Sequence, residues 1–594
     1  MAFQDFDQIT ERRRAERQQR IRKRIMVGAV SAFAFVVLVA GGGFAVASNS
    51  SHGGTQPAAQ ADDQQRPATT GISHVSRVIK LVCNSTDYEQ ECENTLTKAV
   101  KTNPNLSQPK DLLKTSILAI ADEIEKAMTK TTTFQFNTPS EKAAFEDCKV
   151  LVKDAMEELK ESVSKVGNNS LGSLSSTTPD LNNWLSAVMS YQQTCIDGFP
   201  KGKLKDDMEK VLNVSKELTS NSLAMISELS SFLSTFQVPG HSRRLLTQES
   251  SSPTMDNDGF PTWMTNEFRR MLKEKADKPK PNVTVAKDGS GDYKTISEAL
   301  AAMPEKYKGR YVIYVKEGIY EETVNVTKKM VNVTMYGDGS RKSIITGSKN
   351  FVDGLTTFKT ATFVALGEGF IGKAMGFRNT AGPEKHQAVA ARVQADRSVF
   401  INCRFEGYQD TLYAQTHRQF YRSCVIAGTV DFIFGDAAVV FQNCMIVVRK
   451  PLPNQQNIVT AQGRTDKRET TGIVLQNCRI LPDKKLVPVK STIRSYLGRP
   501  WKEYSRTIVM ESTIEDIIHP DGWLPWEGDF ALKTLYYAEF NNKGPGAKVD
   551  ARVKWSGYKV IKRQEATKYT VEPFLQGGSW IKATGVQVHF GLYN

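Results

Sequence analysis

Residues 399–446 read VFINCRFEGYQDTLYAQTHRQFYRSCVIAGTVDFIFGDAAVVFQNCMI and contain a repeated pattern, an Asn or Ser followed by Cys with apolar neighbours. The cysteines of this pattern are Cys403, Cys424, Cys444 and, further on, Cys478, so that two nearly equal intervals precede a longer one. An interval of roughly 20 residues is typical of the coils of a solenoid. A β-sandwich would instead show a strand every ~8–12 residues, with hairpin turns between strands. The pattern therefore predicts a right-handed parallel β-helix with one longer inserted loop.

The β pattern extends from Asn282 to the end of the chain. VTVAKDG, RYVIYVKEG, NVTMYGDG and TIVMEST alternate apolar and polar residues and end at Gly or Asp, as strands do. We therefore expect residues 282–594 to form one all-β domain.

Two aspartates share the repeat interval of this domain. Asp410 in GYQDTLY and Asp431 in GTVDFIFG are separated by the same interval as Cys403 and Cys424. Neighbouring strands of a solenoid lie about 4.8 Å apart, so we expect the two carboxylates to stack on one face. Two carboxyl groups held this close rarely both ionise, and a nearby arginine decides which one keeps its charge.

Other polar residues follow the same geometry. Gln387 in HQAVA precedes Gln409 by nearly the same interval, and YLGRPW places Arg499 and Trp501 two apart on a strand, on one face. The acid beside the arginine can attack a carbonyl, and the other can donate a proton. Amide donors stabilise an oxyanion, and an indole ring stacks on a sugar. The set predicts acyl chemistry on a carbohydrate.

The N-terminal region up to Gly71 indicates export. Residues 1–24 are basic, with eight Lys and Arg from Arg12 onward, and the uncharged residues 25–47 are long enough to span about 30 Å of hydrocarbon as a helix. The basic flank should stay cytosolic, which delivers the remainder to the lumen or outside the cell. An uncleaved anchor and a cleaved signal both fit this segment. Residues 48–71 read as a flexible stalk.

In residues 72–236 apolar residues recur at intervals of three and four positions, with almost no Gly or Pro, as in amphipathic helices. We expect an all-α four-helix bundle, in which Cys83 and Cys92 close a short loop while Cys148 and Cys195 join distant helices. The Ser- and Pro-rich residues 237–281 then form a linker. Within it, the run Arg243, Arg244, Leu245 and Leu246 is accessible to a processing protease.

The use of cysteine and the distribution of charge also indicate that the chain is exported. No CxxC pair is present and only seven histidines occur, so disulfides are favoured over zinc. On adjacent coils Cys424 could pair with Cys444, while Cys403 and Cys478 are either free and buried or paired less obviously. The formal net charge is +14, of which residues 245–594 carry +13. Outside the cell this favours an acidic polysaccharide or a membrane surface over nucleic acid as the partner. Eight N-x-S/T sequons are candidate glycosylation sites: Asn49, Asn84, Asn105, Asn168, Asn213, Asn282, Asn325 and Asn332.

Both halves resemble known families. LVCNSTDYEQECENTL and WLSAVMSYQQTCIDGF resemble the plant invertase and pectin methylesterase inhibitors, which are four-helix bundles with two local disulfides. HQAVA, GYQDTLY, IAGTVDFIFG, YLGRPW, GIYEE and DGSGDYKTISEAL resemble the signature segments of plant pectinesterases. The chain as a whole is similar to the precursor form that carries its own inhibitor-like domain.

The resemblance implies a role for each residue of the set. Asp431 matches the nucleophile that forms an acyl-enzyme, Asp410 the proton donor and later base, and Gln409 the transition-state stabiliser. The substrate-binding positions are Gln387, Arg499, Trp501 and Thr357 of GLTTF. The implied substrate is methyl-esterified homogalacturonan of the cell wall, with no metal or organic cofactor, and inhibitor proteins and a processing protease are further partners. Asp436 stands where the family often has Asn, and an added acid there is expected to raise the pKa of the aspartate pair.

Two other functions use the same features. A β-helical polygalacturonase or lyase would use two carboxylates on one groove to cleave glycosidic bonds, but the NTD, DD, GHG and RIK runs of polygalacturonases are missing. A non-catalytic protein that only binds pectin, or only inhibits, would not need Asp410, Asp431 and Arg499 together.

Overall fold

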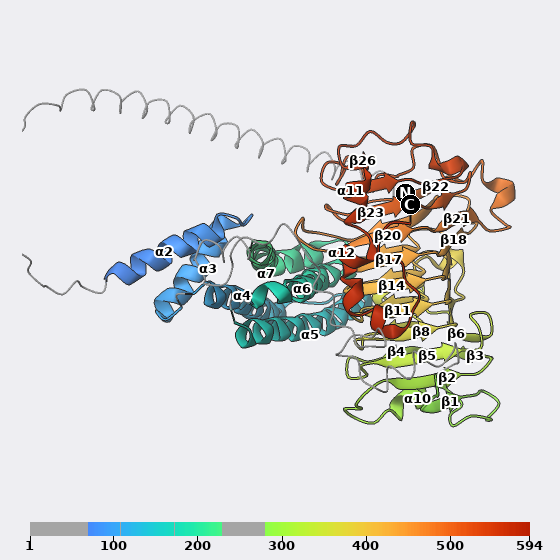
Figure 1. Cartoon of the computed structure of the whole chain (residues 1–594), viewed down its shortest axis with the longest axis horizontal. Helices are drawn as coiled ribbons and strands as arrows, with labels where there is room; N and C mark the ends of the chain where they lie inside the picture. Colours follow the sequence, from blue (N-terminus) through green and yellow to red (C-terminus); the bar gives the residue numbers. More distant parts are fainter. Residues whose placement is uncertain (1–68, 107, 171–172, 229–278, 594) are drawn as a thin grey trace, which may run out of the picture. The chain divides into compact units, whose positions relative to one another are not determined.

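The computed structural model describes residues 69–106, 108–170, 173–228 and 279–593, and the part from Thr70 onward forms one compact unit (Figure 1). Among these residues no helix is both long and apolar enough to cross a bilayer. The predicted membrane or signal segment 25–47 and the predicted processing site 243–246 lie outside the described residues.

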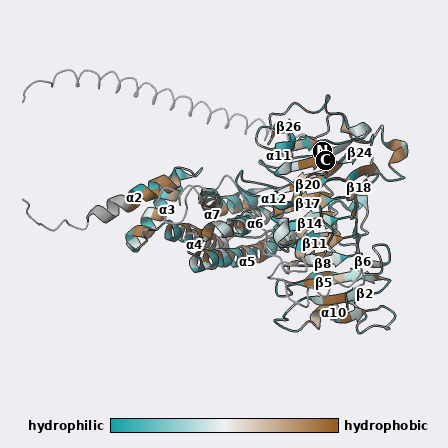
Figure 2. Cartoon of the chain, in the orientation of Figure 1, coloured by the Kyte–Doolittle hydropathy of each residue, from teal (hydrophilic) through white to brown (hydrophobic). Residues whose placement is uncertain are grey.

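The N-terminal part is helical, as predicted. Its helices are α2 (Thr69–Cys83), α3 (Glu89–Thr102), α4 (Pro109–Lys130), α5 (Pro139–Asn168), α6 (Thr178–Gly198) and α7 (Lys203–Ser227). Helix α5 begins at a capping box, in which the Thr138 hydroxyl accepts from the Glu141 backbone N–H and the Glu141 carboxylate accepts from the backbone N–H of Thr138. Helices α4 to α7 pack against one another as a four-helix bundle, with apolar positions recurring along them (Figure 2).

Two disulfides fix this part, and both predicted pairings are confirmed. Cys83 and Cys92 close the loop between α2 and α3. Cys148 and Cys195 join α5 to α6 across 47 residues of sequence. Closing a loop of that length removes about 4 kcal/mol of chain entropy from the unfolded state.

The C-terminal part is a stack of parallel strands in three sheets (Figure 1). The eleven-stranded sheet contains β1 (Val283–Val285), β2 (Tyr311–Val315), β5 (Val333–Gly337), β8 (Ile371–Lys373), β11 (Ser398–Ile401), β14 (Arg418–Arg422), β17 (Ala438–Gln442), β20 (Gly472–Gln476), β23 (Arg506–Met510), β25 (Tyr536–Phe540) and β26 (Tyr558–Val560). The eight-stranded sheet contains β3 (Gly318–Glu321), β6 (Ser343–Gly347), β9 (Gly376–Asn379), β12 (Arg404–Glu406), β15 (Val425–Gly428), β18 (Met445–Val448), β21 (Arg479–Pro482) and β24 (Thr513–Ile514).

The seven-stranded sheet contains β4 (Val324–Val326), β7 (Phe363–Ala365), β10 (Ala391–Val393), β13 (Leu412–Ala414), β16 (Ile433–Gly435), β19 (Asn457–Gln462) and β22 (Ser495–Gly498). Three short helices accompany the strands: α10 (Ile296–Ala301), α11 (Arg563–Thr567) and α12 (Val571–Leu575). Every coil contributes one strand to each of the sheets over most of the stack, which confirms the predicted right-handed parallel β-helix.

The repeated Asn/Ser-Cys pattern marks one corner of the coils. Asn402, Ser423, Asn443 and Asn477 each have a φ between 52° and 56°, the left-handed conformation that Asn tolerates best among residues with a side chain. Each one turns the chain from the eleven-stranded to the eight-stranded sheet, and the following Cys points into the core. The longer third interval arises because residues 449–456 and 463–471 form extended loops on either side of β19.

The predicted Cys424–Cys444 disulfide is wrong in this structure, which holds Cys403, Cys424, Cys444 and Cys478 as buried free thiols. Parallel register directs the stacked Cβ atoms the same way, whereas a disulfide needs them to converge. Each thiol instead donates to backbone carbonyls, Cys424 to Phe400 and Arg422 and Cys444 to Tyr421 and Gln442.

The bundle and the β-helix share one apolar cluster. The seven-stranded sheet presents a row of side chains in register, Val364, Arg392, Tyr413, Phe434 and Ala461. All of these except Arg392 belong to the same buried cluster as the bundle core. The Arg392 guanidinium lies 3.7 Å from the centre of the Phe358 ring, which also belongs to the cluster. The bundle therefore covers the face of the sheet on which the predicted site residues stand.

Candidate active site

The two aspartates stand at equivalent positions on neighbouring coils. Asp410 precedes β13 by two residues and Asp431 precedes β16 by two, and Leu412 of β13 pairs with Ile433 of β16. Both aspartates have a left-handed backbone, with φ of 62° and 50°. A non-Gly residue in this region carries strain that the surroundings must hold, and such residues cluster at functional sites. The predicted stacking of the two carboxylates is confirmed.

The surroundings make the two carboxylates unequal. Arg499 grips Asp431 with two parallel hydrogen bonds, Nε to Oδ1 at 2.8 Å and Nη2 to Oδ2 at 2.5 Å. Among the described residues no cation lies within ion-pair distance of Asp410. Burial, and next the charge of Asp431, raise the pKa of Asp410 well above its usual range, and the more distant Arg499 only partly offsets this. Asp431 is therefore the charged member of the pair, and Asp410 is the member that keeps a proton.

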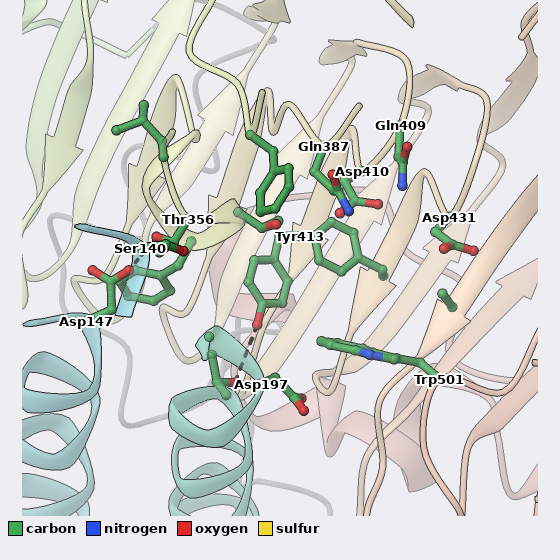
Figure 3. A pocket seen from close by; sticks show the side chains of 18 of the residues that line it. Ser140, Asp147, Asp197, Thr356, Gln387, Gln409, Asp410, Tyr413, Asp431 and Trp501 are labelled. Atoms are coloured by element: carbon green, nitrogen blue, oxygen red, sulfur yellow. Dashed lines mark hydrogen bonds between the residues drawn. The ribbon is translucent and has the colours of Figure 1, made fainter. Parts of the chain in front are cut away.

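All seven predicted site residues line one cavity of about 610 Å³ (Figure 3). They are Thr357, Gln387, Gln409, Asp410, Asp431, Arg499 and Trp501. In Figure 3 Gln387, Gln409, Asp410 and Asp431 lie along one side of the cavity, with Trp501 below them. A volume of this size falls within the range of small-molecule sites, roughly 300–1,000 Å³.

Glycines allow the close packing around these groups. Gly435 ends the strand after Asp431 with a φ of 125°, and a Cβ there would lie 2.0 Å from the carbonyl oxygen of Ala414. Gly463 faces the Trp501 ring, and a Cβ there would lie 2.9 Å from Cε3. Gly435, the second glycine of GTVDFIFG, is therefore required because a side chain there would clash with the neighbouring coil.

Several residues of the cavity were not predicted. Tyr413 and Phe434 stack with ring centres 4.3 Å apart, and Phe434 meets Trp501 edge-on at 6.0 Å. The interval between Tyr413 and Phe434 in the sequence equals that between the two aspartates and was a usable signal. Trp526, whose ring lies 4.3 Å from the Arg499 guanidinium carbon, follows no repeat.

Helices of the bundle complete the cavity wall. The wall residues from the bundle are Thr138, Pro139, Ser140, Asp147, Leu151, Thr194, Asp197 and Gly198. No spacing in the sequence joins them to the β-helix, because the docking of two domains leaves no periodic pattern.

Asp436 does not act on the aspartate pair, contrary to the expectation. Its Oδ1 accepts hydrogen bonds from Gln462 and Thr471, and its nearest acidic neighbour is Glu469. The raised pKa of Asp410 derives from burial and Asp431, without a contribution from Asp436.

The sequons within the described residues are all exposed: Asn84, Asn105, Asn168, Asn213, Asn282, Asn325 and Asn332. Their glycosylation stays a prediction. Asn49 lies outside the described residues.

Comparison with known proteins identifies both domains. The family model described as Pectinesterase matches residues 282–578, and that of the plant invertase/pectin methylesterase inhibitor matches residues 77–225. Two proteins of Arabidopsis thaliana match over 100% of both chains: putative pectinesterase/pectinesterase inhibitor 45, at 52% identity, and probable pectinesterase/pectinesterase inhibitor 13, at 51%. The solved pectin methylesterase from carrot is 55% identical with a TM-score of 0.53, covering 54% of this chain and 100% of its own.

The fold and the paired acids thus define a carboxylic ester hydrolase built on a parallel β-helix. The chain belongs to the pectinesterase family, in the form that joins an inhibitor-like helical domain to the enzyme in one polypeptide.

Proposed function

We propose that this chain hydrolyses the methyl esters of homogalacturonan through an acyl-enzyme on Asp431, releasing methanol and pectate. The observation that carries the proposal is the asymmetry of the two acids. Asp431 forms a bidentate ion pair with Arg499, while Asp410 one coil away has a raised pKa. One acid is prepared to attack and the other to donate.

The first half of the reaction forms the acyl-enzyme. A carboxylate oxygen of Asp431 attacks the ester carbonyl carbon, and the electron pair of the carbonyl moves to its oxygen. Gln387 and Gln409 donate hydrogen bonds to this oxyanion, a contribution of about 3 kcal/mol per donor in comparable sites. The carbonyl re-forms as the bond to the methoxy oxygen breaks, and Asp410 gives its proton to that oxygen. Methanol leaves, and the galacturonate acyl group remains on Asp431 as a mixed anhydride.

The second half restores the enzyme. Asp410, now a carboxylate, takes a proton from water, and the resulting hydroxide attacks the acyl carbon. The bond to the Asp431 oxygen breaks, which releases the galacturonate acid and returns Asp431 to the carboxylate held by Arg499. Arg499, Trp501 and Thr357, which line the same cavity, bind the sugar residues during both halves.

We further propose that the bundle keeps the uncleaved chain inactive toward the polymer. Its side chains form one wall of the cavity that contains Asp410 and Asp431, so a long chain could not pass between the bundle and the sheet. Cleavage at Arg243–Leu246 would break the covalent connection between residues 72–236 and residues 282–594, which allows the bundle to dissociate. The route of the precursor is the secretory pathway to the cell wall, with any membrane attachment confined to residues 25–47.

Methanol release from methyl-esterified pectin tests the enzymatic proposal. The domain from Leu245 onward is expected to release methanol, and the uncleaved chain to release much less. Asp431→Ala should abolish release in the domain, and substantial residual activity of this variant would refute the acyl-enzyme. Polymer length separates the alternatives, because an esterase leaves the backbone intact whereas a polygalacturonase shortens it. No observation favours the glycosidase.

A further inference from the structure

One buried ion pair of the β-helix takes no part in the proposed chemistry. Glu539 of β25 and Arg552, in the loop before β26, have side chains that are each only 1% exposed, and Arg552 Nε donates to Glu539 Oε1 at 2.8 Å. Neither residue lines the cavity. Burying two charges costs desolvation free energy that a pair of apolar side chains would not cost. What the pair holds in place is therefore the question.

The pair fixes the loop that follows β24. Arg552 Nη1 donates to the carbonyl oxygen of Pro520 at 3.0 Å, and Glu539 Oε1 accepts from Trp523 Nε1 at 3.2 Å. Gly522 lies directly against Arg552, because an added Cβ at Gly522 would be 2.3 Å from Arg552 Cδ. Residues 520–523 are thus held at both ends and in the middle by the two charged side chains.

This loop is bonded to the strand that leads to Arg499. The backbone N–H of Leu497 donates to the carbonyl of Gly522 at 2.7 Å, and the N–H of Leu524 donates to the carbonyl of Gly498 at 3.0 Å. Leu497 and Gly498 are the last residues of β22, and Arg499 comes next. The loop therefore runs beside β22 as a further extended segment of the seven-stranded sheet.

Just after this segment the chain places Trp526 on Arg499. The Trp526 ring centre lies 4.3 Å from the guanidinium carbon, while the edge of the guanidinium, through Nε and Nη2, binds both oxygens of Asp431. A guanidinium can make both contacts because it is planar and uses its face for the ring and its edge for the carboxylate. The ring therefore restrains rotation of the guanidinium out of the plane of the Asp431 carboxylate.

We propose that Glu539 and Arg552 are positioning residues for Arg499. By anchoring residues 520–526 they hold the Trp526 ring against the guanidinium, and the ring keeps the guanidinium edge aligned with Asp431. This inference rests on the proposed function, in which Asp431 must be oriented to attack. It assigns to a buried ion pair outside the cavity an effect on the rate of the chemical step, transmitted through one loop and one ring.

The test uses residues 245–594, because the carrot enzyme aligns over its full length with about this part of the chain and shows that it folds alone. The readouts are kcat and KM for methanol release from methyl-esterified pectin. The variants are Arg552→Lys, which keeps the charge but not the planar set of donors, and Trp526→Leu. Trp526→Phe is the conservative variant that retains a ring. The matched control is Arg310→Lys, since Arg310 also bonds a backbone carbonyl, that of Gly369, but lies outside the cavity and at the opposite end of the stack.

Both changes are expected to act on kcat. Trp526→Leu should lower kcat about fivefold, the upper value of a contact between a cation and a ring, and leave KM within twofold. Trp526→Phe should restore most of the loss. Arg552→Lys should lower kcat about threefold, because the loop keeps its bonds to β22 but loses part of its anchor. Arg310→Lys should leave kcat as in the parent.

A double-mutant cycle separates positioning from general support of the fold. In the Arg499→Lys background no planar group remains to be aligned, so Trp526→Leu or Arg552→Lys should each lower kcat further by less than about 1.5-fold. A purely structural role would lower kcat by the same factor in both backgrounds. Thermal unfolding of every variant shows whether it is folded. If Arg552→Lys does not fold, Trp523→Phe takes its place, since this change removes the indole N–H that Glu539 accepts from.

Three results would overturn the inference. The first is an unchanged kcat in folded Trp526→Leu or in the folded loop variant. The second is an equal fall in the two backgrounds or in Arg310→Lys. The third is a rise in KM with kcat unchanged, which would assign Trp526 to sugar binding alone. Absence of methanol with the parent domain would instead overturn the proposed function itself.

Discussion

Replacement of Arg499 by lysine keeps the charge beside Asp431 but removes the two-point grip. Arginine binds both carboxylate oxygens, at 2.8 and 2.5 Å, whereas lysine is a point charge that can hold only one of them well. The guanidinium also lies over the Trp526 ring at 4.3 Å. We therefore expect Arg499→Lys to leave Asp431, the proposed nucleophile, with a neighbouring charge but poorly oriented.

The magnitude follows from what is lost. One charge-assisted hydrogen bond is worth about 1.5–3 kcal/mol, and the contact with the ring about 0.5–1 kcal/mol. A total of about 2–4 kcal/mol corresponds to a loss in kcat of roughly 30-fold to several hundred-fold, at 1.36 kcal/mol per tenfold. Arg499→Gln, which also removes the charge, should lose more, since breaking a buried pair leaves an uncompensated carboxylate.

The assay is methanol release from methyl-esterified pectin by residues 245–594, with kcat and KM determined separately. Arg494→Lys is the matched control, because Arg494 is an exposed arginine just before β22. A loss of less than threefold in Arg499→Lys, or an equal loss in Arg494→Lys, would contradict the role of the bidentate pair in orienting Asp431.

Three further predictions concern other parts of the chain. As the proposed donor, Asp410 must be protonated, so kcat/KM should fall as pH rises through the raised pKa of Asp410. Asp410→Asn should be inactive, yet it should melt at a higher temperature than the parent at neutral pH, because burial and the charge of Asp431 disfavour the ionised form of Asp410. This difference in melting temperature should vanish below the unfolded pKa of about 3.9. Gly435→Ala should lower the free energy of unfolding by about 2–4 kcal/mol, because the added Cβ would clash with the Ala414 carbonyl and the residue has a positive φ. The control is Gly591→Ala, where an added Cβ meets open space, and chemical denaturation of both variants measures the difference. In the uncleaved chain, Asp147→Asn combined with Asp197→Asn should raise methanol release severalfold, because the two changes remove the ion pairs with Lys359 and Lys502 that hold the bundle on the β-helix. The control Asp207→Asn should not raise release, since its ion pairs within the described part of the chain are with Lys203 and Lys210 of its own helix. Equal effects of the two changes would rule out the interface as the cause.

The sequence predicted those features that repeat with the coil. Asp410 and Asp431 could be placed together because a solenoid converts one repeat interval of sequence into one step between strands. Arg499 is 68 residues from Asp431, and it was placed from its two-residue spacing to Trp501 and then from the LGRPW resemblance, since the inserted loops around β19 break the interval.

Features that depend on side-chain direction or on docking were not predictable in this way. The stacking of Cys424 on Cys444 was correct, but stacking alone does not make two Cβ atoms converge. Asp147 meets Thr356 across 209 residues and Asp197 meets Lys502 across 305, and no local pattern records either contact. Trp526 reaches Arg499 from a loop without strand periodicity.

The apolar cluster shared by the bundle and the seven-stranded sheet bears on what a cut in the linker can achieve. A cut between residues 228 and 279 removes no residue of this cluster, to which Val188 and Tyr191 belong together with Val364 and Tyr413. What a cut changes is the effective concentration of the bundle at the seven-stranded sheet. An intact chain holds its own bundle at the millimolar level typical of a tethered partner, whereas a cut chain obeys an ordinary two-body equilibrium. On the proposed route of cleavage and secretion, the fraction of open protein would be set by dilution, so that the cleaved protein would be mostly closed at high concentration and mostly open at low concentration.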